Sequence, residues 1–214
     1  MIKKNRLREG ILNHVKSNFA LYFLVCTFFA IGVAAGAFTV RALDDMQKQA
    51  LIKYLQGFFQ ILTSKNIDSS AVLIQSIKNN IQTVFVIWIL GITVIGIPVT
   101  ILIIGIRGFI IGFTVGFLIN GLGFKGLIFT LLAILPQNII IIPCLLAISV
   151  ISLSFSLMII KNKMAKKWTN NYWQKFLSYS ILIIALFVTT ILGSLIEAYI
   201  VPVFIRLIST YLTT

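Results

Sequence analysis

Residues able to do catalytic or metal chemistry are scarce in this sequence of 214 residues. The one histidine, His14, lies in a basic N-terminal stretch, and the two cysteines, Cys26 and Cys144, lie inside apolar segments. A zinc protease needs several ligands in a pattern such as HExxH, which one histidine cannot supply. Cysteines placed in this way do not indicate a disulfide or a redox pair. No aspartate falls within an apolar segment. The sequence therefore predicts no catalytic residue, no metal site and no cofactor.

The strongest candidate for a binding site is a polar interruption within a long apolar stretch. The stretch LLAILPQNIIIIPCLL contains Pro136, Gln137 and Asn138, with a second proline at Pro143. Broken helices at membrane depth expose carbonyls and amides that transporters use to bind substrates or ions. Together with Asn120, these residues could line such a pathway. We favour an architectural alternative, in which the amides bond to backbone groups freed by Pro136 or to a neighbouring helix.

The composition identifies the class of protein. Hydrophobic residues make up 59% of the chain and charged residues only 11%, whereas soluble domains contain about a quarter charged residues. A multi-pass membrane protein is therefore predicted. The net charge is +13, and the basic residues cluster at 3–16 and 161–175, beside apolar segments. This arrangement is typical of cytoplasmic loops that contact anionic membrane lipids, and it does not indicate nucleic-acid binding.

Charge and hydropathy divide the chain into five parts and predict an all-α fold. Residues 1–18 form a basic cytoplasmic head. Residues 19–40 are uncharged and are interpreted as an uncleaved first span, because the apolar core of a signal peptide is shorter. The remaining parts are an extracytoplasmic helical segment at 41–80, a transmembrane bundle at 81–200 with a cytoplasmic basic loop at 161–175, and a C-terminal tail at 201–214.

About five spans are predicted, with the N-terminus inside and the C-terminus outside. Residues 126–160 would measure about 52 Å as one straight helix at ~1.5 Å per residue, which is too long for one crossing of a ~30 Å hydrocarbon core and too short for two. We therefore expect a short helix at 126–135, a break at Pro136–Asn138 and a spanning helix from 139 to 160. The other four spans are predicted at 19–40, 82–106, 108–124 and 177–200.

The ionisable residues of this predicted bundle fall near the ends of the spans. Arg107 marks the predicted turn between the second and third spans. Glu197 is expected at the outer surface, where it could pair with Lys125 or Arg206. Because ionisable groups within spans commonly mark transport pathways, these positions count against a transport function.

The polar segment 41–80 is predicted to form two amphipathic helices. Asp68 or Ser69 is expected to cap the second amphipathic helix, which carries Val72, Leu73 and Ile77. The segment is interpreted as a folded extramembrane loop, and the alternative is a docking surface for a partner protein. The candidate partner face of the first helix comprises Leu51, Leu55, Phe58 and Leu62.

Glycines at four-residue spacing are the strongest local signal. Small residues at this spacing let the backbones of two membrane helices approach closely. Packing within the chain is the expected use, and an oligomer or partner interface is the alternative. These glycines are Gly32 and Gly36 in the first span and Gly108, Gly112 and Gly116 in the third.

Three stretches, in this order, resemble the family of stage II sporulation protein M. They are IKNNIQTVFVIWILGIT (77–93), GFTVGFLINGLG (112–123) and LPQNIIIIP (135–143). In the wider family the position of Gln137 is often His and that of Ile141 is often Glu, and this sequence has neither residue at these positions. Their absence weakens an ion-coupled interpretation and agrees better with the sporulation branch.

The resemblance implies a role in engulfment of the forespore by endospore-forming bacteria. The family protein forms a membrane complex with stage II sporulation proteins D and P, which cut peptidoglycan, and has no hydrolase activity of its own. By this resemblance the chain is expected to be a non-catalytic scaffold that anchors or recruits these hydrolases in the septal or engulfing membrane. The alternative, argued from the residues, is a small-solute or ion transporter or channel subunit centred on Pro136–Asn138.

Overall fold

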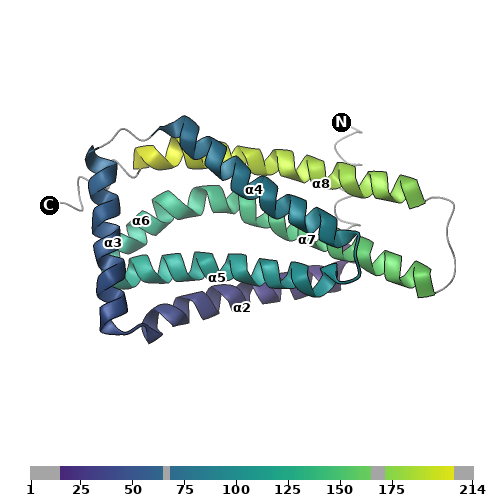
Figure 1. Ribbon diagram of the computed structural model, residues 1–214, viewed down its shortest axis with the longest axis horizontal. Helices are drawn as coiled ribbons and strands as arrows, with labels where there is room; N and C mark the ends of the chain where they lie inside the picture. The colour runs from purple at the N-terminus through teal and green to yellow at the C-terminus, as the bar shows by residue number, and fades with distance from the viewer. Residues whose placement is uncertain (1–14, 65–67, 165–171, 205–214) are drawn as a thin grey trace.

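The computed structural model describes residues 15–64, 68–164 and 172–204, and within these ranges the chain is helical and contains no strand. Five helical passes lie along the long axis, and one further helix, α3 (Asp45–Ser64), crosses one end of the bundle (Figure 1). The prediction of an all-α, multi-pass bundle is therefore confirmed. The passes are α2 (Phe19–Ala42), α4 (Ser69–Gly91), α5 (Gly96–Leu122), α6 (Phe124–Phe129) with η1 (Thr130–Ile134) and α7 (Leu135–Met164), and α8 (Tyr172–Leu195) with η2 (Ile196–Ile200).

Successive passes run in opposite directions, so the connections gather at two ends. The helix α3 marks one end, and the start of α2, the turn after α4 and the end of α7 lie toward the other (Figure 1). Lys16 precedes α2, Lys161 lies in the last turn of α7 and Lys175 in the first turn of α8, so all three lie near this second end. Because cytoplasmic ends of membrane helices are rich in lysine and arginine, we predict that the second end is cytoplasmic and that α3 is extracytoplasmic.

Among the described residues, four helices are long and apolar enough to cross a membrane: Phe19–Ala42, Gly96–Leu122, Phe124–Asn162 and Tyr172–Phe204. The fifth pass, α4, lies beside α5, α7 and α8 (Figure 1). It differs in composition, because its first half contains serine, lysine, asparagine and glutamine and its second half is apolar. Its N-terminus is capped as predicted, since the Asp68 carboxylate accepts hydrogen bonds from the backbone N–H groups of Ser70 and Ala71.

The predicted spans at 82–106 and 108–124 have the wrong boundaries. The helix α4 ends at Gly91, a turn follows, and α5 runs from Gly96 to Leu122, so Arg107 lies within a helix and not at a turn. Pro98 lies in the first turn of α5 and does not kink the helix. The N–H groups of a first turn have no acceptor within the helix, so the N–H that proline lacks costs no helical hydrogen bond. At Gly96 the chain folds so tightly that an added Cβ would collide with the Leu90 carbonyl.

The predicted break at Pro136–Asn138 is also wrong, because α6, η1 and α7 follow one another without interruption. Proline cannot donate the usual helical hydrogen bond. Here the turn before it widens into a π-helix, in which the N–H of Leu135 donates to the Thr130 carbonyl, five residues back. This continuous helix is longer than one crossing requires. It curves, and its C-terminal end extends together with the start of α8 beyond the turn between α4 and α5 (Figure 1).

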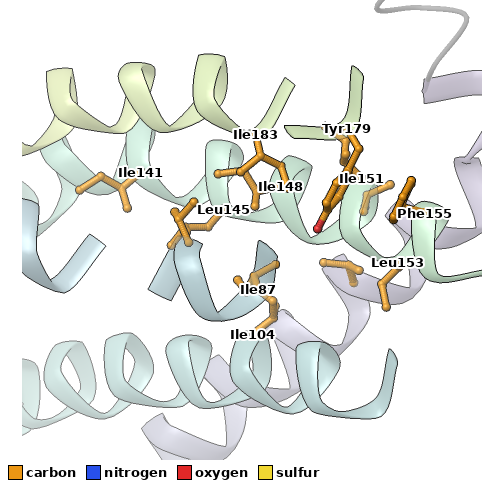
Figure 2. Close-up of a cluster of buried hydrophobic side chains, with 13 residues drawn as sticks. Ile87, Ile104, Ile141, Leu145, Ile148, Ile151, Leu153, Phe155, Tyr179 and Ile183 are labelled. Carbon is orange, nitrogen blue, oxygen red and sulfur yellow. The ribbon is translucent and has the colours of Figure 1, made fainter. Parts of the chain in front are cut away.

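The apolar core lies where α4, α5, α7 and α8 meet (Figure 2). Ile87 of α4, Ile104 of α5 and Ile148 of α7 are buried almost completely. Because lipid tails are as apolar as these side chains, their burial stabilises the bundle mainly through close packing and not through removal from water.

The end of α4 is capped by side chains from two other helices. The last four carbonyls of a helix, here those from Trp88 to Gly91, lack the usual partner within it and need another. The Ser152 hydroxyl donates to the Ile87 carbonyl over 2.9 Å, and the Tyr179 hydroxyl donates to the Trp88 carbonyl over 2.7 Å. Gly91 makes room for this cap, because an added Cβ would collide with the Tyr179 hydroxyl.

The spaced glycines lie in an interface inside the chain, between α2 and α5. A Cβ added at Gly32 would collide with the Gly105 carbonyl, and one added at Gly112 would collide with the Val33 carbonyl. Gly36 and Gly108 likewise face backbone atoms of the opposite helix, and Gly116 faces Ala37. The two backbones therefore touch along most of their length.

We expect Gly112→Ala to lower the free energy of unfolding by roughly 1–3 kcal/mol, because the added methyl group must push α2 away from α5. Gly105→Ala in the same helix is the matched control, since its Cβ would meet only the Phe28 carbonyl, at 3.9 Å, and should change stability by no more than about 1 kcal/mol. Unfolding of the purified proteins in detergent measures both values. Equal stability of the two variants would contradict the glycine interface.

The turn after α4 tests both the helix boundaries and the orientation. In a cysteine-free background, we expect Val94→Cys to react with a membrane-impermeant maleimide only after the cells are permeabilised. Asp45→Cys, at the start of α3, should react in intact cells. Protection of Val94→Cys under both conditions would favour a span through this position, and reaction of only Val94→Cys in intact cells would invert the orientation.

Candidate functional site, a polar cluster inside the bundle

Arg107 lies near the middle of a pass. At ~1.5 Å per residue it is roughly 17 Å from the start of α5 and roughly 23 Å from its end, and its side chain is half-buried. The expectation that it lies near the end of a span is therefore wrong. A charged side chain at such depth is costly in a bilayer, and by default it indicates a functional site.

The guanidinium group of Arg107 is held by the neighbouring helix α4. It donates to the Thr83 hydroxyl and, over 3.4 Å, to the Asn79 carbonyl. The Thr83 hydroxyl donates to the same carbonyl over 3.0 Å. Among the described residues no carboxylate lies within ion-pair distance of Arg107, but the Glu197 carboxylate is close enough to interact with its positive charge electrostatically.

Glu197 is the second ionisable residue of the cluster, and it lies in the π-helical segment η2. The Ser76 hydroxyl donates to its carboxylate over 2.6 Å. The Ser194 hydroxyl lies 2.9 Å from that of Ser76, and the Asn80 amide donates to Ser194 over 3.0 Å. The Asn80 amide and the hydroxyls of Ser194 and Ser76 are thus linked in a row of hydrogen bonds that ends at the Glu197 carboxylate. Among the described residues no ion pair joins Glu197 to Lys125, one of its two predicted partners. The other, Arg206, lies outside the described residues.

This chain of hydrogen bonds joins α4 to α8 and is shielded from solvent. Ser76, Asn80 and Ser194 are each at most 5% exposed. The pair of Ser76 and Glu197 combines a hydroxyl with a carboxylate, as a nucleophile and its base would, but a substrate cannot reach a hydroxyl at this depth of burial. Within the described ranges no group of three His, Cys, Asp or Glu side chains could hold a metal ion. The cluster is suited to holding helices together and to presenting charge within the membrane.

The residues proposed from sequence for a binding site do not converge on one place. Gln137 is buried and Asn138 half-buried, and their amide nitrogens donate to the carbonyls of Ala133 and Ile134, over 2.8 and 2.7 Å. Pro143 and Asn120 are exposed on the outside of α7 and α5. Gln137 and Asn138 therefore serve the turn that precedes them in their own helix.

Of the candidate partner face on α3, only part can be located. Leu51 is half-buried. The side chains of Leu55, Phe58 and Leu62 lie outside the described residues, so the predicted face stays a prediction.

Sequence reasoning missed the polar cluster because it interpreted charge as a mark of a helix end. Arg107 has apolar residues on both sides, in ILIIGIRGFIIGF, and this pattern alone could have placed it inside a helix. Ser76 and Asn80 lie four residues apart and so share one helical face. Their partners Ser194 and Glu197 are more than 110 positions away, and no local pattern connects them.

Comparison with known proteins gives one match. A family model described as stage II sporulation protein M matches residues 25–202, a range that contains the three resembling stretches and the whole polar cluster. No curated protein and no solved structure matches the chain.

The hydrogen-bond chain predicts which serine of α8 matters for stability. We expect Ser194→Ala to lower the free energy of unfolding by roughly 1–2 kcal/mol, because Asn80 and Ser76 both lose a buried partner. Ser178→Ala, at an exposed position of the same helix, is the control and should behave like the parent protein. Unfolding in detergent measures both, and an unchanged Ser194→Ala would show that the buried chain does not hold α4 to α8.

Proposed function

Because this chain belongs to the stage II sporulation protein M family, we propose that it is a non-catalytic membrane scaffold that anchors or recruits peptidoglycan hydrolases during engulfment of the forespore. Membership of the family makes it a sporulation-related membrane protein. The proposal adds the septal or engulfing membrane as its location and the stage II sporulation proteins D and P as its partners.

The observation that carries the proposal is the placement of α3. This helix lies across the end of the bundle and is joined to α2 by the extended residue Leu43 and by Asp44 (Figure 1). Among its described side chains, Met46 is 84% and Tyr54 74% exposed, so both are open to a partner. With this end outside the cell, as the charge distribution predicts, α3 offers apolar and basic groups on the side where peptidoglycan is cut.

The acidic residues near α3 support a non-catalytic role. Cleavage of a glycan uses two carboxyl groups that flank the bond, one of them a general acid in a desolvated setting. The side chain of Asp45 is 96% exposed and pairs with Lys48 at 3.9 Å, which is the setting of a solvated surface ion pair.

A transporter or channel subunit is the second candidate function, and the position of Arg107 favours it. Intramembrane ionisable residues commonly line pathways for ions or protons. This candidate no longer depends on a break at Pro136–Asn138, because the helix is continuous there. It predicts that Arg107→Gln abolishes flux through reconstituted liposomes while leaving hydrolase binding intact.

The scaffold is tested by isolating the tagged protein from sporulating cells after mild crosslinking. We expect stage II sporulation proteins D and P to copurify with the parent protein. The double variant Lys48→Glu, Lys53→Glu, which reverses two charges on α3, should lose them at least several-fold while remaining in the membrane. Lys175→Glu, near the other end of the bundle, is the control and should retain them. Absence of both hydrolases from the parent complex would overturn the scaffold.

A further inference from the structure

One face of α4 is polar and exposed although the helix lies among apolar spans. Gln75, Lys78, Asn79 and Gln82 are exposed, and the half-buried Arg107 adjoins them through its bond to the Asn79 carbonyl. The Gln75 amide donates to the Asn79 side chain over 3.1 Å. We call these five residues the α4 polar strip.

The strip lies at the depth of the hydrocarbon core. Lys78 is roughly 20 Å along α4 from Gly91, at ~1.5 Å per residue, and Arg107 is roughly 17 Å from the adjacent start of α5. Exposed apolar side chains lie on both sides of the strip along α4, at Ile74 (67% exposed) and Phe85 (56%). Two cations and three amides at this depth cannot face lipid tails without a large cost.

We propose that the α4 polar strip is the docking surface for a membrane-spanning helix of a second protein that carries a carboxylate at the depth of Arg107. Charge complementarity identifies this occupant, because the strip holds two positive charges and no negative one. Of the four acidic residues that the structure describes, only Glu197 lies within a pass of the bundle. Its carboxylate accepts from Ser76 and interacts electrostatically with Arg107, so it offsets at most one of the two positive charges of the strip. The charge that remains, at the exposed Lys78, is compensated by another chain.

The spacing of the strip fits a single helix. Gln75, Asn79 and Gln82 follow one another at four and three residues, which is the repeat of a seam between two helices. Amide side chains can bond across such a seam to the polar groups of the partner.

A second copy of this chain is a poor occupant. In a two-fold dimer each residue of the interface faces the same patch on the other copy. Lys78 and Arg107 would then face their own counterparts, and like charges across an interface disfavour the contact.

The inference goes beyond the proposed function, since it requires no particular enzyme as the partner, and it can fail while hydrolase recruitment stands. The test uses the full-length protein in phosphatidylcholine vesicles, where no anionic headgroup competes for the strip. The probes are three fluorescent leucine–alanine transmembrane peptides that differ only at the central residue, which is Glu, Gln or Lys. Energy transfer from the labelled protein reports binding.

We expect the Glu peptide to bind roughly 3- to 30-fold more tightly than the Gln peptide, as one interhelical polar contact in a membrane allows, and the Lys peptide to bind least. Arg107→Gln should remove the preference for Glu, and Arg107→Lys should retain it. Lys78→Gln changes an exposed residue, cannot disturb packing, and should reduce the preference. Lys175→Gln, near the cytoplasmic end, is the matched control and should leave it unchanged.

Equal binding of the Glu and Gln peptides would overturn the proposal, and so would an undiminished preference in both Lys78→Gln and Arg107→Gln. Energy transfer between differently labelled copies of the protein measures its self-association. Self-association that the Glu peptide displaces would identify a second copy as the occupant and would also overturn it.

Discussion

The structure depends on one constraint, which is that polar groups inside a bilayer must find partners within the protein. Three places in the bundle obey it in different ways. Around Pro136 the N–H of Leu135 donates to the Thr130 carbonyl, and the side-chain amides of Gln137 and Asn138 donate to the carbonyls of Ala133 and Ile134. At the end of α4, hydroxyl groups from α7 and α8 take the place of water. In the polar cluster, Asn80, Ser194 and Ser76 form hydrogen bonds with one another, and Ser76 donates to Glu197.

Close packing is the second requirement, because lipid tails compete equally for apolar surface. The glycines of α2 and α5 meet it by letting backbone touch backbone, which larger side chains would prevent. The α2–α5 pair and the hydrogen-bonded α4–α8 pair thus hold different parts of the bundle by different means. The first uses shape alone, and the second uses specific donors and acceptors.

These two modes of association bear on function. A helix as polar as α4 is stable at membrane depth only while its polar groups are hydrogen-bonded or paired with an opposite charge. On its buried face Ser76 and Asn80 form hydrogen bonds with Glu197 and Ser194 of the same chain. On its exposed face Lys78 and its neighbours form the surface that we propose as a docking site for another membrane protein. The helix α3 offers a separate surface outside the apolar passes, so a partner could be held both in the membrane and beside it.

The sequence by itself determined the class of protein, the family and the helical fold, because apolar length, charge clustering and motif order are local properties. It also identified the cap at Asp68 and the glycine spacing. The break at Pro136 and the turn at Arg107 were wrong for a common reason. Each was inferred from a residue's own chemistry, whereas a proline ring, a guanidinium or a carboxylate in a membrane takes its place according to the partners that distant helices supply. Only the tertiary structure brings Thr83 to Arg107 and Ser76 to Glu197, and so only it decides that these charges lie inside the bundle.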